Sequence, residues 1–408
     1  MLIHNIGLLA GILPEGTGAL RGRDISRLVT LADAWLLVRG DRIVDFGPMA
    51  TCPAEPDRLD ARGGIVVPAF CDCHTHIVYA GSREGEFRDK IAGLSYAEIA
   101  ARGGGIINSA LRLADTDEDE LYRQSLARLR QVIAQGTGAI EIKTGYGLTL
   151  ESELKMLRVI DRLRRELPQV PVRATFLGAH AVGPDYRGRQ EDYVAHVIGD
   201  MIPAVQEQGI ADYIDVFCEQ GFFTPDQTRR ILRAGAAAGM RPRLHADQLT
   251  RSGGSAVGVG CGAISVDHLE AAGDEEIALL AASDTIAVGL PGASFFLSDP
   301  YAPLRRLIDA GATVALASDF NPGTSPSGSM QMVWALGCIK MRLTPEEALN
   351  AITINGAAAL GLDGELGSVT RGKLASLNIF DAPSLAFIPY AYTTPTLSAA
   401  VRSGVIWV

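Results

Sequence analysis

Histidines and one aspartate stand where the predicted strands of this chain end. His74 and His76 follow the apolar segment 65–70, and because alternate side chains of a strand share a face, both imidazoles should point the same way. Four further polar residues follow later predicted strands: His180, His245, His268 and Asp319. Three imidazoles and a carboxylate suit Zn²⁺ or Fe²⁺. The pattern therefore predicts a metal site made by His74, His76, His245 and Asp319.

Such a site suits hydrolysis. A bound divalent ion lowers the pKa of its water to about 7, which provides hydroxide at neutral pH. We expect Asp319 to take the water proton and deliver it to a leaving nitrogen, and His268 to donate a hydrogen bond to the developing oxyanion. Lys143 could bridge a second ion as a carbamate, but the four ligands suffice for one, so we expect a single ion. Glu219 follows another strand and is a reserve proton carrier.

The elements that must position these residues alternate along the middle of the chain. Adding segment 65–70 to later apolar strands and amphipathic helices gives about eight β/α units, with helices capped by Thr116, Thr224 and Thr344. A closed parallel barrel brings the carboxyl ends of all its strands to one face. That fold, a (β/α)₈ TIM-like barrel of the α/β class, would gather ligands up to about 245 residues apart. An open doubly wound sheet is the alternative, but no GxGxxG follows the first strand.

Both ends of the chain are rich in short strands. Segments 34–39 and 42–47 form a predicted hairpin around Gly40-Asp41, and the last 45 or so residues have the same texture. We expect residues 1–62 and 364–408 to form a small β-sandwich domain beside a metal-dependent barrel of residues 63–363.

The composition and net charge limit the classes of molecule that this chain is expected to bind. The 408 residues carry a net charge of −10, which disfavours nucleic acid and anionic membranes but allows a small-molecule substrate. We find no signal peptide and no apolar stretch of about 20 residues, so we expect a cytoplasmic protein. The six cysteines lack CxxC spacing and should be reduced thiols. Cys71 and Cys73 have the opposite strand parity to the histidines and should point away from the metal.

Longer motifs carry a resemblance. The stretch AFCDCHTH at 69–76, with an Asp after the last strand, resembles the amidohydrolase superfamily. A narrower resemblance, to the family that opens an imidazolone ring in histidine degradation, rests on EIKTGYGL, TFLGAHAV, DVFCEQGF, LHADQL, VDHLE and ASDFNPGTSPSGSMQ. These motifs lie between about residues 65 and 360.

The resemblance implies a distorted (β/α)₈ barrel with a terminal β-sandwich and one Zn²⁺ or Fe ion on the four ligands. It implies a hydrolase of a cyclic amide C–N bond, in which water opens 4-imidazolone-5-propanoate to N-formimidoyl-L-glutamate. Without the resemblance, Arg83 is a charged loop residue that could bind a carboxylate through both of its terminal nitrogens. The resemblance implies that Arg83 holds the propionate with Tyr96 and His180. The ring pocket would be lined by Tyr146, Asn321, Gly323 and Thr324, with His268 as the oxyanion partner. A homodimer is a further expectation.

One departure bears on mechanism. Many members carry Glu three residues after the third histidine, where this chain has Gln248. An amide can hydrogen-bond a ring but cannot carry a proton at neutral pH. We therefore expect Gln248 to bind substrate only, and proton transfer to rest on Asp319, with His268 as the second candidate. An aminohydrolase of purines or pyrimidines, which releases ammonia, and a non-catalytic metal-binding module are the alternatives.

Overall fold

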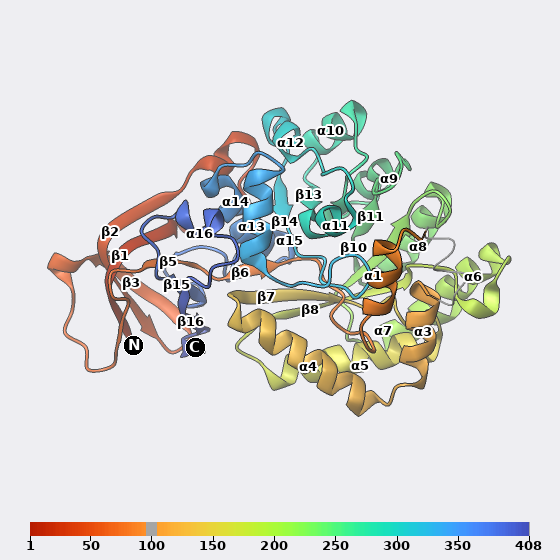
Figure 1. The fold of residues 1–408 in the computed structure, drawn as a ribbon, viewed down its shortest axis with the longest axis horizontal. Helices are drawn as coiled ribbons and strands as arrows, with labels where there is room; N and C mark the ends of the chain where they lie inside the picture. Colours follow the sequence, from red (N-terminus) through yellow and green to blue (C-terminus); the bar gives the residue numbers. More distant parts are fainter. Residues whose placement is uncertain (95–103, 408) are drawn as a thin grey trace.

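The computed structural model describes residues 1–94 and 104–407, which form a parallel barrel and a separate sheet built from both ends of the chain (Figure 1). The neighbouring barrel strands pair in parallel in the order β14-β13-β12-β11-β9-β8-β7-β6. Their bounds are β6 Phe70–Asp72, β7 Thr137–Lys143, β8 Val172–Ala179, β9 Tyr213–Cys218, β11 Leu244–Ala246, β12 Ser265–His268, β13 Ile286–Gly289 and β14 Val314–Leu316. The short β10 (Arg241–Pro242) pairs with β9. The predicted barrel is confirmed.

The barrel closes just beyond the ends of its first and last strands. Thr75 and Phe320 form an isolated parallel bridge. The amide of Asp319 donates to the carbonyl of His74 at 3.0 Å, and the amide of His76 donates to the carbonyl of Phe320 at 2.9 Å. These bonds place the segments after β6 and β14 side by side.

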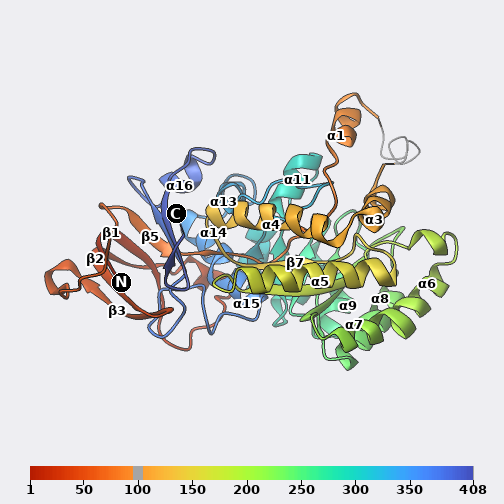
Figure 2. The same cartoon turned by 90° about the horizontal axis from the view of Figure 1, so that it is seen from below.

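Helices surround the barrel, and α4 and α5 cover β7 and β8 (Figure 2). Two of them begin at the predicted capping threonines: Thr224 and Thr344 each accept from a backbone amide three residues on, in complete capping boxes. The helices are α1 Glu84–Ile91, α3 Ile106–Asp115, α4 Glu118–Ala134, α5 Leu150–Glu166, α6 Gln190–His196, α7 Ile202–Gln208, α8 Pro225–Ala237, α9 Gly254–Gly260, α10 Asp274–Ala281, α11 Pro291–Leu297, α12 Leu304–Ala310, α13 Met330–Ile339, α14 Pro345–Ile352, α15 Ile354–Ala359 and α16 Phe387–Tyr390.

Two local predictions are wrong. The cap of α4 is Asp117, whose carboxylate accepts from the amide of Asp119, and not Thr116. Segment 65–70 is not one barrel strand: β5 (Ile65–Pro68) pairs with β1 and β15 in the terminal sheet, and only β6 enters the barrel. Because β5 and β6 are both fully buried, their joined apolar run has no alternation that marks the break.

The terminal sheet joins the two ends of the chain in the order β17-β16-β15-β5-β1-β2-β3, with β4 beside β1. Its strands are β1 Leu2–Ile12, β2 Val29–Arg39, β3 Arg42–Pro48, β4 Arg58–Asp60, β5, β15 Leu377–Phe380, β16 Leu397–Arg402 and β17 Val405–Ile406. The predicted hairpin is present as β2 and β3. The sheet has its own apolar cluster, which includes Leu36 and Leu377. The residue boundaries given above for the two domains stay predictions.

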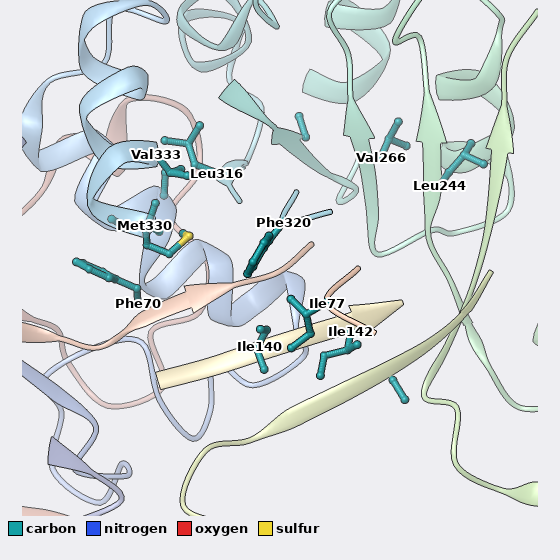
Figure 3. Packing of buried hydrophobic residues seen from close by; sticks show 14 of the residues in the cluster. Phe70, Ile77, Ile140, Ile142, Leu244, Val266, Leu316, Phe320, Met330 and Val333 are labelled. Atoms are coloured by element: carbon teal, nitrogen blue, oxygen red, sulfur yellow. The ribbon is translucent and has the colours of Figure 1, made fainter. Parts of the chain in front are cut away.

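The main core fills the space between the barrel strands and the helices. Figure 3 shows part of it, with side chains from β6, β7, β11, β12, β14 and α13. Gly136, directly before β7, has φ +110°, and a Cβ there would lie 2.8 Å from the ring of Phe70, so this position requires glycine. Among the described residues, no helix is both long and apolar enough to cross a membrane.

Candidate metal centre

The carboxyl ends of the barrel strands bring five histidines and one aspartate together. The ring centroids of His74 and His245 are 4.5 Å apart, and that of His76 lies 5.3 Å from His74 and 5.5 Å from His245. Oδ1 of Asp319 is 3.5 Å from Nε2 of His74 and 3.6 Å from Nε2 of His76. Each of these side chains is at most 3% exposed. The structure thus brings the four predicted ligands close together. Their ligand atoms fall into two overlapping groups within 4.8 Å of one another: His74, His76 and Asp319, and His74, His245 and His268.

Two of the imidazoles make hydrogen bonds that leave them ready to bind a divalent cation. Nδ1 of His74 lies 2.7 Å from Oδ2 of Asp267, and Nδ1 of His245 lies 2.9 Å from Oδ2 of Asp215. When Nδ1–H donates to a carboxylate, Nε2 carries the lone pair that a metal needs. Within the described part of the chain, Nε2 of both rings is buried without a hydrogen-bond partner. The donor set therefore matches a metal site.

The supporting carboxylates belong to a buried charge network that the sequence analysis missed. Nζ of Lys143 donates to Glu141 at 2.7 Å and to Asp215 at 2.8 Å. Arg243 lies 3.5 Å from Asp267. The signal was present in β7, where Glu141 and Lys143 alternate with isoleucine inside a strand that is wholly buried. Lys143 is thus ion-paired with carboxylates.

Burial sets the protonation of the site. It lowers the pKa of His245 to about 3, although Asp215 acts in the opposite direction, and it lowers the pKa values of His74 and His76 well below the usual value. All three rings are therefore neutral at pH 7, as ligation requires. Burial raises the pKa of Asp319 to about 7, with His268 opposing the shift.

A cavity of about 770 Å³ opens onto His76, His245 and Asp319 and contains most of the other predicted site residues. His180 stacks on His76 at 5.4 Å between centroids, and its Nδ1 lies 3.1 Å from the carbonyl oxygen of Gly145. Tyr146 meets both imidazoles edge to face. The lining also includes Arg83, Gln248, His268, Asn321, Gly323 and Thr324. Tyr96 lies outside the described residues.

The loop after β14 forms one wall of the cavity. Nδ2 of Asn321 donates to the carbonyl of Asp319 at 2.7 Å, and Oδ1 of Asn321 accepts from the amides of Gly323 and Thr324 at 2.8 Å. A Cβ on Gly323 would lie 2.3 Å from Nη1 of Arg83. Asn321 therefore shapes the loop, and the absence of a side chain at Gly323 makes room for the guanidinium.

The carboxylate of Glu219 fixes the backbone of the loop that carries Gln248. Oε2 of Glu219 accepts from the amides of Gln248, Leu249 and Thr250 at 3.1, 2.9 and 3.3 Å. Glu219 is not among the described residues that line the cavity. The expectation of a reserve proton carrier is therefore wrong, because this carboxylate is engaged in shaping the loop.

His268 ends β12 in an unusual conformation. Its φ is +85° and that of Leu269 is +69°, a left-handed pair that directs the imidazole toward the other histidines. Nδ1 of His268 lies 3.4 Å from Oε1 of Glu270.

Cys71 and Cys73 pack in an apolar cluster with Ala357, away from the site, as their parity predicted.

The barrel and its histidine site define the amidohydrolase class: the Amidohydrolase family model matches residues 65–406. In fold, guanine deaminase of E. coli is similar, with a TM-score of 0.74 at 14% identity, covering 99% of this chain and 98% of that one. Triazine hydrolase from Arthobacter aurescens has a TM-score of 0.74 at 16% identity and covers 99% and 94%.

Two sequence relatives define the family within that class. Imidazolonepropionase of Christiangramia forsetii is 48% identical over 407 residues, which are 99% of each chain. Imidazolonepropionase of Flavobacterium johnsoniae is 47% identical over 408 residues, again 99% of each. The chain therefore belongs to the imidazolonepropionase family. The narrower resemblance drawn from its motifs is confirmed.

Proposed function

We propose that this chain hydrolyses 4-imidazolone-5-propanoate, a cyclic amide of histidine catabolism, to N-formimidoyl-L-glutamate. The observation that carries the proposal is one cavity that holds both a carboxylate-supported histidine cluster and, on its wall, an arginine. A small substrate with a ring and a carboxylate has a partner for each of its parts there.

We assign the metal to His74, His76, His245 and Asp319, with Zn²⁺ or Fe as the ion. When bound, a divalent ion activates water and polarises a carbonyl. The neutral imidazoles supply nitrogen lone pairs, and the Asp215 and Asp267 carboxylates fix the orientation of two of them.

Asp319 would carry the proton in the reaction. A carboxylate oxygen of Asp319 takes a proton from the attacking water as the oxygen–carbon bond forms at the ring carbonyl. When the ring C–N bond breaks, the same oxygen delivers the proton to the leaving nitrogen. His268 donates a hydrogen bond to the carbonyl oxygen as negative charge develops there.

The remaining residues bind and orient the substrate. Arg83 holds the propionate carboxylate with Tyr96 and His180. Tyr146, Gln248, Asn321, Gly323 and Thr324 enclose the ring. Gln248 serves as a hydrogen-bonding group because its amide cannot carry a proton at neutral pH. A cytoplasmic location and a homodimer stay predictions.

The test is the loss of 4-imidazolone-5-propanoate absorbance with the purified full chain, together with an ammonia assay. We expect substrate loss without ammonia, abolition by a chelator and restoration by Zn²⁺ or Fe²⁺. Ammonia release from a purine or pyrimidine, with no action on the imidazolone, would replace the proposal with an aminohydrolase. Metal binding without turnover of either substrate would indicate a binding module.

A further inference from the structure

Lys143 lies beneath the histidine cluster and is completely buried with its three neighbouring carboxylates. Its Nζ lies 2.7 Å from Oε1 of Glu141, 2.8 Å from Oδ2 of Asp215 and 3.7 Å from Oδ2 of Asp267. The ammonium has three N–H groups and faces three anions. It lines no part of the cavity described above.

Lys143 contacts the same two oxygens that hold the imidazoles. Oδ2 of Asp215 is also the partner of His245 Nδ1, and Oδ2 of Asp267 is also the partner of His74 Nδ1. One ammonium thus joins two parallel chains of contacts, each running from lysine through a carboxylate to an imidazole. The two histidines come from strands at different positions of the barrel, and Lys143 links their supports.

The buried charges around Lys143 explain why a cation is needed at this position. Glu141, Asp215 and Asp267 are three buried acids, and Lys143 and Arg243 are the two cations beside them. Arg243 is occupied largely by backbone, since it donates to the carbonyls of Cys73 at 2.7 Å and Ala359 at 3.1 Å. A buried carboxylate that loses its cation is strongly unfavourable and would move or take up a proton.

We propose that Lys143 is a positioning residue that couples Asp215 to Asp267 and thereby holds His245 and His74 with both Nε2 lone pairs directed at one metal position. The inference rests on the proposed metal site and adds a residue outside its ligand set. Lys143 acts through the two aspartates and touches neither substrate nor reacting atoms.

The experiment measures Zn²⁺ affinity of the metal-stripped full chain by competition with a chromophoric chelator. Lys143→Met keeps the length of the side chain and removes its charge, and we expect Zn²⁺ to bind about 10- to 100-fold more weakly. Lys340→Met, at an exposed lysine that directly follows α13, is the matched control and should bind like the wild type. The visible spectrum of the Co²⁺-loaded Lys143→Met variant should also differ from that of the wild type, because ligand orientation has changed.

A double variant distinguishes weak Zn²⁺ binding caused by lost positioning from weak binding caused by misfolding. Lys143→Met with Glu141→Gln removes one positive and one negative charge, so the net charge of the buried groups around position 143 is unchanged. We expect this variant to melt cooperatively and still to bind Zn²⁺ weakly. Wild-type affinity and an unchanged Co²⁺ spectrum in either folded variant would overturn the proposal.

A further measurement needs no variant. Metal-free wild type labelled with ¹⁵N-histidine should show two imidazoles fixed in the Nδ1–H form, and tautomer mixtures at both would also overturn the proposal. If the wild type itself binds no Zn²⁺, the proposed function fails. If the wild type binds and Lys143→Met binds equally well, only this inference fails.

Discussion

Nε of Arg83 donates to Oε1 of Glu86 at 2.9 Å, and the two side chains form a forked ion pair on the wall of the cavity. Oε1 of Glu86 also accepts from the amide of Gly105 at 3.0 Å. Glu86 therefore fixes the plane of the guanidinium, which orients Arg83 in advance for the carboxylate that we propose it binds.

Arg83→Ala should weaken only substrates that bear the propionate. A charge-assisted hydrogen bond contributes about 1.5–3 kcal/mol, so kcat/KM should fall about 10- to 100-fold. The measurement compares the natural substrate with an imidazolone that lacks the carboxylate. Arg88→Ala, at an exposed position on α1, the helix that begins directly after Arg83, is the control. Equal losses for both substrates would assign Arg83 a different role.

Gly323→Ala should resemble the loss of Arg83. The added Cβ would lie 2.3 Å from Nη1 of Arg83, so the guanidinium has to shift. We expect KM to rise about 10-fold, the equivalent of about 1.4 kcal/mol, with little change in Tm. Gly364→Ala, where a Cβ meets nothing within 4 Å, is the matched control. A normal KM in Gly323→Ala would show that Arg83 tolerates displacement.

Asp319→Asn should remove proton transfer while preserving the fold. We expect kcat to fall by about 10²- to 10⁴-fold, the usual contribution of a positioned acid or base. The assay is steady-state turnover, with metal content measured on the same sample because Asp319 is also a proposed ligand. Near-normal kcat with full metal content would remove Asp319 from the proton-transfer step.

Gln248→Glu should keep or raise activity if proton transfer limits the rate. The loop stays in place because Glu219 holds its backbone amides and not the side chain of residue 248. The measurement is kcat across pH 6 to 9 for both proteins. A large loss of kcat at every pH would mean that the amide itself is required for binding the ring.

Acid should destabilise the metal-free protein through His180. Burial lowers the pKa of His180 to about 4 from its ordinary 6.5. Between these values the unfolded chain binds more protons than the folded one, so the stability due to neutral His180 is present above about 6.5 and lost as pH falls toward 4. His180→Gln lacks this titration and should gain about 2 kcal/mol relative to wild type between pH 7 and pH 4.5. Urea unfolding of both proteins at the two pH values measures the difference, and an unchanged difference contradicts it.

The sequence by itself determined the barrel and singled out the histidines and the aspartate that the structure brings together. His74-Thr-His76 specifies two imidazoles on one face because side chains alternate along a strand. The other predicted ligands follow apolar strands, and parallel strands deliver their carboxyl ends to one face. The helix caps at Thr224 and Thr344 were also predicted, because a cap depends only on residues close in sequence, and the structure shows a complete capping box at each.

Only the tertiary structure decided which groups support those ligands. Asp267 reaches His74 across 193 residues of sequence, and Lys143 reaches Asp215 across 72. Nothing in a local pattern specifies such pairs, because closure of the barrel brings them together. The break between β5 and β6 was also hidden, since both strands are buried on every side and a strand without an exposed face shows no alternation.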